Sequence, residues 1–438
     1  MDIGLFTILM FGSFFLLIAL GIPLAWVMLS LALIFGFILE GPTVLNFLVF
    51  RTWHTMHLFA LIAVPLFIFM ANMLRYSGIA DDLFKTVYLW LGPLRGGLAM
   101  TTVVVCTILG AMVGTVGAGT TIMGLIALPA MLERKYDKHL ALGSILGGGA
   151  LGIMIPPSVA FILYGTFGAL SIGKMFMGGV GPGLTLAALY ITYIGVRSYL
   201  NPTLAPALPK EERTASLRQK IWMLRTILLP ALLILGVLGS IYLGLATPSE
   251  AAGVGALGAI LCAAVRGRLN WQNLKATLFS SFKTVGVIMW IAISAIAFIG
   301  VFAQAGGAEF VSGLLAGLPL GKWGILIVSQ VILILLGMVL DVVGIIILCI
   351  PIFVPVITAL GFDPLWFGIV FNVNLQIAFL SPPFGYSLFY LKAVAPPDTT
   401  TMDLYRATWP FIVLQVIGLA LVMAFPQIAI WLPNKMIK

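Results

Sequence analysis

Two stretches of this sequence, residues 115–157 and 341–383, align with each other without a gap. At a constant spacing of 226 positions, residues of the first half recur in the second: Phe84 as Phe310, Pro93 as Pro319, Pro129 as Pro355, Asp137 as Asp363, Pro156 as Pro382 and Pro157 as Pro383. The pairs extend well beyond a single motif. Internal repeats with proline-interrupted apolar segments are typical of secondary transporters. We therefore expect a chain built from two related halves.

The composition of the chain predicts a membrane protein. Only 8% of its 438 residues are charged and 61% are hydrophobic, whereas soluble proteins carry about 25% charged residues. Apolar runs such as 5–39, 58–74, 227–245 and 284–303 reach the length of about 20 residues that a spanning helix needs. These runs are continuous rather than alternating, which excludes a transmembrane β-barrel. The predicted fold class is therefore an all-α polytopic membrane protein.

The placement of charge predicts how the chain is oriented. The net charge is +9, and basic residues gather between Arg197 and Arg225 and again in the tail 435–438. Basic loops remain on the cytoplasmic side, so we interpret 197–225 as a cytoplasmic loop that joins the halves. The first residues contain only Asp2 and lack the basic region of a cleaved signal peptide. We expect a periplasmic N-terminus, a cytoplasmic C-terminus and a first span that stays in the mature protein.

The two halves differ in charge at one equivalent linker. Residues 132–140 contain Arg134, Lys135 and Lys138, but the equivalent residues 358–366 contain no lysine or arginine. The first linker should face the cytoplasm and the second the outside. This asymmetry favours an inverted repeat, with a pseudo-two-fold axis in the membrane plane.

Glycine and proline predict interruptions inside each half. Residues 98–131 carry four glycines near their middle, where the backbone freedom of glycine allows a turn, so we expect a re-entrant helical hairpin there and a second one at 323–359. Proline pairs should break the helices that follow, at 139–167 and 364–391. A broken helix frees carbonyl groups that can bind a cation.

The predicted organisation follows from these segments. Two repeat cores alternate with scaffold helices in this order: N-terminal scaffold helices (1–75), first repeat core (84–196), cytoplasmic loop (197–225), further scaffold helices (226–303), second repeat core (310–407), and C-terminal helix and tail (408–438).

Asp341 is the acidic residue with the clearest functional potential. Most of the other carboxylates have a structural explanation, because Glu250 belongs to a Thr-Pro-Ser-Glu capping box and Asp137 and Asp363 fit helix N-caps. Asp341 lies at the predicted tip of the second hairpin, deep in an apolar stretch. An intramembrane carboxylate is a candidate functional residue by default. It either caps the second arm or contributes to cation binding, and both roles can coexist.

Other polar candidates lie near the predicted interruptions. Asn372, Asn374, Gln376 and Ser381 approach the second break, and Asn374 and Gln376 cannot share one helix face. Thr115 lies at the first tip, where its hydroxyl could cap, pack or bind a cation. The glycine run 147–149 lacks the Lys-Ser/Thr of a phosphate loop and indicates close packing or unwinding instead.

The glycine and proline motifs closely resemble those of the large membrane subunit of tripartite ATP-independent periplasmic (TRAP) transporters, the DctM-like family. The resemblance covers nearly the whole chain and rests on these segments: Gly114–Ala118 with Met123–Leu125 and Leu128–Pro129, Leu151–Ser158, Leu340–Asp341, Pro351–Pro355, Asn374–Gln376 and Ser381–Gly385. The last two segments resemble the branch labelled mannitol/chloroaromatic, whose substrates include 2-oxo and hydroxy acids.

The resemblance implies a Na⁺-driven importer of an organic acid in a bacterial inner membrane, working by an elevator mechanism. A periplasmic substrate-binding protein (DctP-like) would deliver the acid. A small four-helix membrane subunit (DctQ-like) would be a separate polypeptide in the lipid bilayer. An ion channel, with the hairpins as its filter, is the alternative, and no catalytic constellation supports an enzyme.

The resemblance also implies site residues. Candidate Na⁺ ligands carried over from the family are Gly114, Thr115, Val116, Gly117, Gly149, Ala150, Ile153, Pro156, Leu340, Asp341, Gly344, Asn374, Ser381 and Pro382. Candidate substrate residues are Thr115, Ser158, Asn372 and Gln376. Family members often carry hydroxyl residues where this chain has Val116 and Ala150, so backbone carbonyls are expected to contribute more here.

Overall fold

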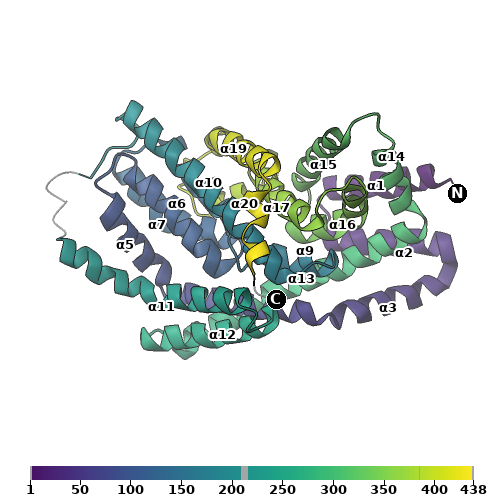
Figure 1. The fold of residues 1–438 in the computed structure, drawn as a ribbon, viewed down its shortest axis with the longest axis horizontal. Coiled ribbons are helices and arrows are strands. Elements are labelled where there is room, and N and C mark those ends of the chain that lie inside the picture. Colours follow the sequence, from purple (N-terminus) through teal and green to yellow (C-terminus); the bar gives the residue numbers. More distant parts are fainter. Residues whose placement is uncertain (1, 209–215, 384, 437–438) are drawn as a thin grey trace.

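The computed structural model describes residues 2–208, 216–383 and 385–436, and its regular structure over these residues is entirely helical (Figure 1). Nine helical segments among them are long and apolar enough to cross a membrane. The predicted all-α polytopic fold is thereby confirmed. Several shorter apolar helices are also present, so the number of crossings and the sides of the termini remain predictions. Part of the expected cytoplasmic loop (209–215), Phe384 of the second motif and the last two residues of the tail lie outside the described residues.

The N-terminal region contains five helices: α1 (Ile3–Ala19), α2 (Leu24–Glu40), α3 (Val44–Met56), α4 (Ala63–Tyr76) and α5 (Ile79–Leu91). The structure divides the apolar run 5–39 between α1 and α2. The reason is local, because Gly21 adopts a left-handed φ of 83° and Pro23 precedes α2 as its N-cap. The run therefore forms two consecutive helices.

The first half continues with α6 (Gly97–Val113), α7 (Val116–Glu133), α8 (Lys138–Ala150), α9 (Val159–Phe167) and α10 (Ile172–Leu200). Helices α6 and α7 pack against each other across a two-residue connection, Gly114-Thr115. Between α8 and α9 the chain passes through a short 3₁₀ turn and a cis Pro156-Pro157 bond. The residue ranges of these helices thus overlap closely with the ranges expected for the first hairpin and the first broken helix.

The middle of the chain forms α11 (Leu217–Tyr242), α12 (Pro248–Val265) and α13 (Trp271–Gln304). The buried residues of α11 are Pro230, Ile234, Val237 and Ile241, which recur at helical spacing and form one stripe. Its remaining apolar side chains, such as Leu235 at 66% exposure, are free to contact lipid. The run expected at 284–303 begins earlier than predicted, because α13 continues without interruption from Trp271.

The second half contains α14 (Gly307–Ala316), α15 (Lys322–Gly337), α16 (Val342–Ala359), α17 (Pro364–Leu380), α18 (Tyr386–Lys392) and α19 (Thr401–Ala424), followed by the short α20 (Gln427–Ile430). A shift of 226 positions carries α7 onto α16 at both ends. Pro382-Pro383 is cis, as Pro156-Pro157 is. The two halves therefore repeat not only residues but also helix boundaries.

Contacts between the halves are reciprocal. Helix α7 packs on α18 of the other half, and its counterpart α16 packs on α9. In the same way α8 contacts α19, while α17 contacts α10. Glycines allow these close approaches: a Cβ on Gly147 would lie 2.4 Å from the ring of Phe411, and one on Gly368 would lie 2.5 Å from the ring of Tyr164. Each half therefore completes the packing of the other.

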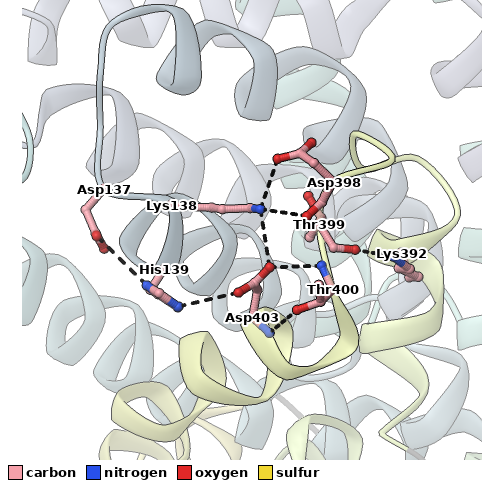
Figure 2. A network of polar contacts seen from close by, with 8 residues as sticks. All are labelled: Asp137, Lys138, His139, Lys392, Asp398, Thr399, Thr400 and Asp403. Atoms are coloured by element: carbon pink, nitrogen blue, oxygen red, sulfur yellow. Dashed lines mark hydrogen bonds and ion pairs between the residues drawn. The ribbon is translucent and has the colours of Figure 1, made fainter.

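A polar network also joins the halves at the starts of α8 and α19 (Figure 2). The Lys138 ammonium lies 3.1 Å from the Asp398 carboxylate and 3.2 Å from that of Asp403. His139 lies between Asp137, at 3.9 Å, and Asp403, at 4.0 Å. Asp403 also closes a capping box with Thr400. The network fixes the first turn of α8 against the first turn of α19.

Replacing Lys138 with alanine should lower stability only modestly. The Asp398 side chain is 75% exposed, and solvent-exposed ion pairs contribute about 0.2–1 kcal/mol. Thermal unfolding of the purified protein in detergent, compared with Lys174→Ala, checks this. Lys174 is an exposed lysine for which no ion pair is found among the described residues. A large loss for Lys138→Ala alone would mean that the network carries more of the packing energy than its exposure indicates.

Candidate functional site

The two interhelical turns meet at one cavity of about 500 Å³. Gly114 to Gly117 line it from the first half and Asp341 to Val343 from the second. Residues flanking both helix breaks also reach it, with Ile153 and Val159 on one side and Phe379 and Tyr386 on the other. Helix α13 and Leu24 of α2 line the rest of the cavity. Segments far apart in the sequence are thus brought together in the interior of the helical bundle.

The first turn packs backbone to backbone on the first break. Gly114 has a left-handed φ of 63°, and a Cβ there would lie 2.6 Å from the Pro157 carbonyl oxygen. A Cβ on Gly152 would lie 2.7 Å from the Thr115 carbonyl oxygen. Only glycine permits both approaches without displacement of the backbone. The Pro157 carbonyl oxygen is therefore held against the first turn, and the Thr115 carbonyl oxygen against the first break.

The hydroxyl groups of the first half are used inside the protein. The Ser158 Oγ donates a 2.6 Å hydrogen bond to the Ile153 carbonyl, and the Thr120 Oγ1 donates one of 3.0 Å to the Val116 carbonyl. Ser158 is fully buried within the break and does not line the cavity. Thr115, in contrast, lines the cavity and makes no capping hydrogen bond to α7. Thr115 is therefore the hydroxyl residue of this turn that is placed to meet a ligand.

The second turn presents a carboxylate to the cavity. Asp341 caps α16 by accepting hydrogen bonds from the amides of Val343, at 3.3 Å, and Gly344, at 3.0 Å. It also lines the cavity. The capping role considered for this residue is therefore real. Asp341 therefore caps α16 and lines the cavity at the same time.

The remaining candidates divide by position. Gly117, Val116 and Ile153 line the cavity with Gly114, Thr115 and Asp341. The candidates that do not line it are Gly149, Ala150, Pro156, Ser158, Leu340, Gly344, Asn372, Asn374, Gln376, Ser381 and Pro382. The first group forms the surface that a bound ion or solute would meet directly.

The polar residues of α17 point into the protein interior. The Asn374 amide nitrogen donates to the carbonyl and to the side-chain oxygen of Gln330 on α15, at 2.9 and 2.8 Å. The Asn372 amide donates to the Gly368 carbonyl at 2.8 Å. Gln376 is fully buried, and within the described part of the chain neither of its amide atoms has a hydrogen-bond partner. Asn374 thus holds α17 against α15.

Sequence reasoning missed the wall that faces the two turns. Lys283 and Thr284 of α13 and Tyr386 and Tyr390 near the second break line the cavity. A second cavity of about 320 Å³, lined by Asn72 and Arg75 of α4, shares Thr115, Gly117, Thr284 and Tyr390 with the first. Lys283 lies directly before the apolar run 284–303, so hydropathy alone does not assign it to a membrane helix. The continuation of α13 through Lys283 was the signal that was missed.

Asn72 fixes the two wall helices to each other. Its Nδ2 donates to the Ser281 hydroxyl at 3.0 Å, and its Oδ1 accepts from the Ser280 hydroxyl at 3.3 Å. The wall is therefore a preassembled pair of helices, α4 and α13.

The available donors are those that a hard cation prefers. Among the described residues there is no group of three or more His, Cys, Asp or Glu side chains that could hold a metal ion. The site offers instead one carboxylate, the Thr115 hydroxyl and the carbonyls of interrupted backbone. Carboxylate and carbonyl oxygens suit hard cations rather than thiophilic metals. These residues fit an ion such as Na⁺.

Comparison with known proteins places the chain in a family. Residues 11–428 match the family described as tripartite ATP-independent periplasmic transporter, DctM component. The chain belongs to this DctM family. It is therefore a permease component of a TRAP transporter, an ion-coupled secondary transport system that works with a periplasmic binding protein, and not an enzyme. The expected large-permease family and transporter class are confirmed.

Individual relatives carry different solutes. The chain is 30% identical to the C4-dicarboxylate TRAP transporter large permease protein DctM of Pseudomonas aeruginosa, over 91% of each sequence. It is 31% identical to the ectoine/5-hydroxyectoine large permease protein UehC of Ruegeria pomeroyi, over 85% of this chain and 86% of the relative. The isethionate permease protein DctMQ of Oleidesulfovibrio alaskensis is 28% identical over 96% of this chain and 65% of its own length.

A solved structure shares the fold. The YdaH transporter of Alcanivorax borkumensis superposes with a TM-score of 0.67, covering 94% of this DctM chain and 99% of that chain at 15% identity. This similarity supports the helical membrane architecture.

Proposed function

We propose that this DctM chain is the large permease of a Na⁺-coupled importer that takes up an organic acid by an elevator mechanism. A DctP-like periplasmic protein delivers the acid, and a DctQ-like four-helix subunit supports the permease in a bacterial inner membrane. The observation that carries the proposal is the meeting of both turns and both helix breaks at one cavity. Discontinuous helices around a central site are the usual construction of ion and substrate sites in secondary transporters.

The two halves form an inverted repeat in this proposal. Matching boundaries of α7 and α16 and the reciprocal contacts of α7 with α18 and of α16 with α9 support a two-fold relation. A two-fold axis requires such exchange, because each contact must occur twice. The pairs α6–α7 and α15–α16 are then re-entrant hairpins that enter from opposite faces. The basic linker Arg134–Lys138 assigns the first hairpin to the cytoplasmic face.

Two Na⁺ sites are proposed, each formed by one interhelical turn and the helix break beside it. The first site uses carbonyls from Gly114 to Gly117 and from the segment Gly149–Pro156. The second uses Asp341, with carbonyls of Leu340 and of the break near Ser381 and Pro382. The close backbone contact of Gly114 with Pro157 and the position of the Asp341 carboxylate at the cavity wall support this assignment.

The moving unit consists of the hairpins, the broken helices α8–α9 and α17–α18, and the helices α10 and α19 that pack on them. The wall helices α4 and α13, joined by Asn72, belong to the fixed scaffold together with α12. The cavity lies between these two groups, which is where a sliding unit would expose its cargo. Na⁺ occupancy then controls whether the loaded unit crosses.

The transported acid is proposed to be a small carboxylic acid. The relative from Pseudomonas is named for C4-dicarboxylates, and the motif Asn374–Gln376 resembles a branch whose substrates include 2-oxo and hydroxy acids. Candidate acids are therefore succinate, malate, pyruvate and lactate. Thermal stabilisation of the DctP-like partner by this panel selects the acid, because a ligand stabilises the protein that binds it.

Reconstituted uptake tests the proposal. Proteoliposomes that contain this chain and its small subunit should accumulate the selected radiolabelled acid only with an inward Na⁺ gradient and with the binding protein outside. Choline in place of Na⁺, and omission of the binding protein, should each reduce uptake to background. Uptake that needs neither, together with ionic current down a gradient, would instead establish a channel. Stabilisation by none of the acids would contradict the substrate class.

A further inference from the structure

Lys283 places a positive charge on the cavity wall. It lies in the first half of α13, its side chain is exposed, and it lines the larger cavity together with Thr115 and Asp341. No hydrogen bond or ion pair to Lys283 is found among the described residues. Ionisable side chains within a membrane bundle are costly and normally face a partner or an aqueous cavity. The partner of Lys283 is therefore expected to enter the cavity from solution.

The charges of the cavity indicate an anion. Among the described residues that line the larger cavity, Lys283 and Asp341 are the only charged ones, and most of the others are apolar. A Na⁺ ion held by Asp341 neutralises its carboxylate, which leaves Lys283 as the uncompensated charge. The ammonium has three hydrogen-bond donors and no acceptor, so it suits a carboxylate. A volume of about 500 Å³ lies within the range of small-molecule sites.

The lining residues lie toward one side of the scaffold. Basic residues Arg266 and Arg268 lie between α12 and α13, and basic loops face the cytoplasm. Arg266 makes an ion pair with Asp82 of α5 and donates to the Thr226 carbonyl near the start of α11. This cluster therefore assigns the start of α13 and the end of α4 to the cytoplasmic side.

Both cavities are lined by limited portions of the two wall helices. On α13 the lining residues of both cavities run from Ser280 to Ile291, while the later part of the helix contributes none. On α4 they run from Ile68 to Arg75, next to its C-terminal end. We take this lining as that of the inward-facing state.

We propose that Lys283 binds the carboxylate of the transported acid on the cytoplasmic side, as a release-side residue of the fixed wall. The inference rests on the proposed function and adds a specific contact to it. Because Lys283 belongs to α13 and not to the moving unit, the acid meets it only after the unit has carried its cargo inward. Lys283 therefore sets the affinity of the inward-facing state and not the affinity for acid arriving from outside.

The test measures the two sides separately. Na⁺-driven uptake into proteoliposomes is measured for the acid selected from succinate, malate, pyruvate and lactate. The binding protein is present only outside, so that only one orientation of the permease contributes. One titration varies the external acid, and the other varies unlabelled acid preloaded in the lumen, which inhibits by occupying the inward-facing site. Lys283→Gln should raise the lumenal concentration for half-inhibition about tenfold or more. The external half-saturation concentration should stay unchanged.

Matched variants make the test decisive. Lys275→Gln removes another exposed lysine of α13 that lines neither cavity, and it should alter neither titration. Lys283→Arg keeps the charge and should keep lumenal inhibition close to that of the wild type. Lys283→Met, which keeps the apolar stem, replaces the glutamine variant if that protein does not fold. An unchanged lumenal titration in the neutral variants, or an equal change in Lys275→Gln, would overturn the role of Lys283.

The controls also separate this inference from the proposed function. If the wild type shows Na⁺-driven, binding-protein-dependent uptake and the neutral Lys283 variants match it on both sides, only the inference fails. If the wild type shows no such uptake, the proposed function fails and the inference fails with it.

Discussion

Asp341→Asn is expected to raise the Na⁺ concentration for half-maximal uptake about tenfold or more. The carboxylate is the only acidic side chain among the described residues that line the cavity. A hydrogen bond or contact to a charged group contributes about 1.5–3 kcal/mol, and each 1.4 kcal/mol corresponds to about a factor of ten. Asparagine is about as good an N-cap as aspartate, so the substitution removes the charge but keeps the cap of α16. Initial uptake rates at increasing NaCl and constant ionic strength measure the effect.

Asp363→Asn is the matched control. Asp363 also caps a helix of the second half, by accepting hydrogen bonds from the amides of Leu365, at 2.7 Å, and Trp366, at 3.1 Å. It does not line the cavity. The control should therefore leave the Na⁺ dependence unchanged. Equal Na⁺ dependence in Asp341→Asn and the wild type would show that Asp341 serves the helix alone.

Gly114→Ala is expected to abolish nearly all uptake and to lower the stability of the protein. A side chain in the left-handed region costs about 1–2 kcal/mol. The added Cβ would also lie 2.6 Å from the carbonyl oxygen of Pro157, so the turn and the break must move apart. That movement separates the carbonyls proposed to bind Na⁺. Uptake rate and the midpoint of thermal unfolding, with and without NaCl, measure the two effects.

Gly361→Ala isolates the backbone cost. Gly361 has a left-handed φ of 81°, but a Cβ there meets nothing within 4 Å. This variant should lose only about 1–2 kcal/mol of stability and should retain uptake and stabilisation by Na⁺. If Gly114→Ala behaves in the same way, the contact between the first turn and the first break is not required for transport.

Local sequence patterns predicted where helices are interrupted better than they predicted which helices pack against each other. Prolines and glycines act on their own turn of the chain, so the interruptions around Pro156 and Pro382 could be placed from sequence. The run 5–39 was not divided at Gly21 and Pro23, because hydropathy alone cannot locate a turn between two apolar helices. The start of α13 was placed too late for a related reason: a lysine within a long helix looks like the end of an apolar run.

The composition of the cavity depends on contacts that sequence pattern cannot supply. Asp341 and Thr115 could be proposed from their tips, and the structure brings both to one cavity. Asn374 was grouped with them by its distance from the break, but its amide is directed to Gln330 on α15. A residue's position along a helix does not say which neighbouring helix its side chain meets. Lys283 and Tyr390 reach the cavity only through long-range packing.

The reciprocal packing of the halves has a consequence for biosynthesis. The ribosome delivers the first half to the membrane before the second half is synthesised. During that interval α7 lacks its partner α18, and α9 lacks its partner α16. The glycines that later contact Phe411, on α8, and Tyr390, on α7, have no side chain packed against them during that interval. We therefore expect a chain truncated after α11 to be inserted but not folded, and to be degraded rapidly in cells. Supplying the second half as a separate polypeptide should protect it.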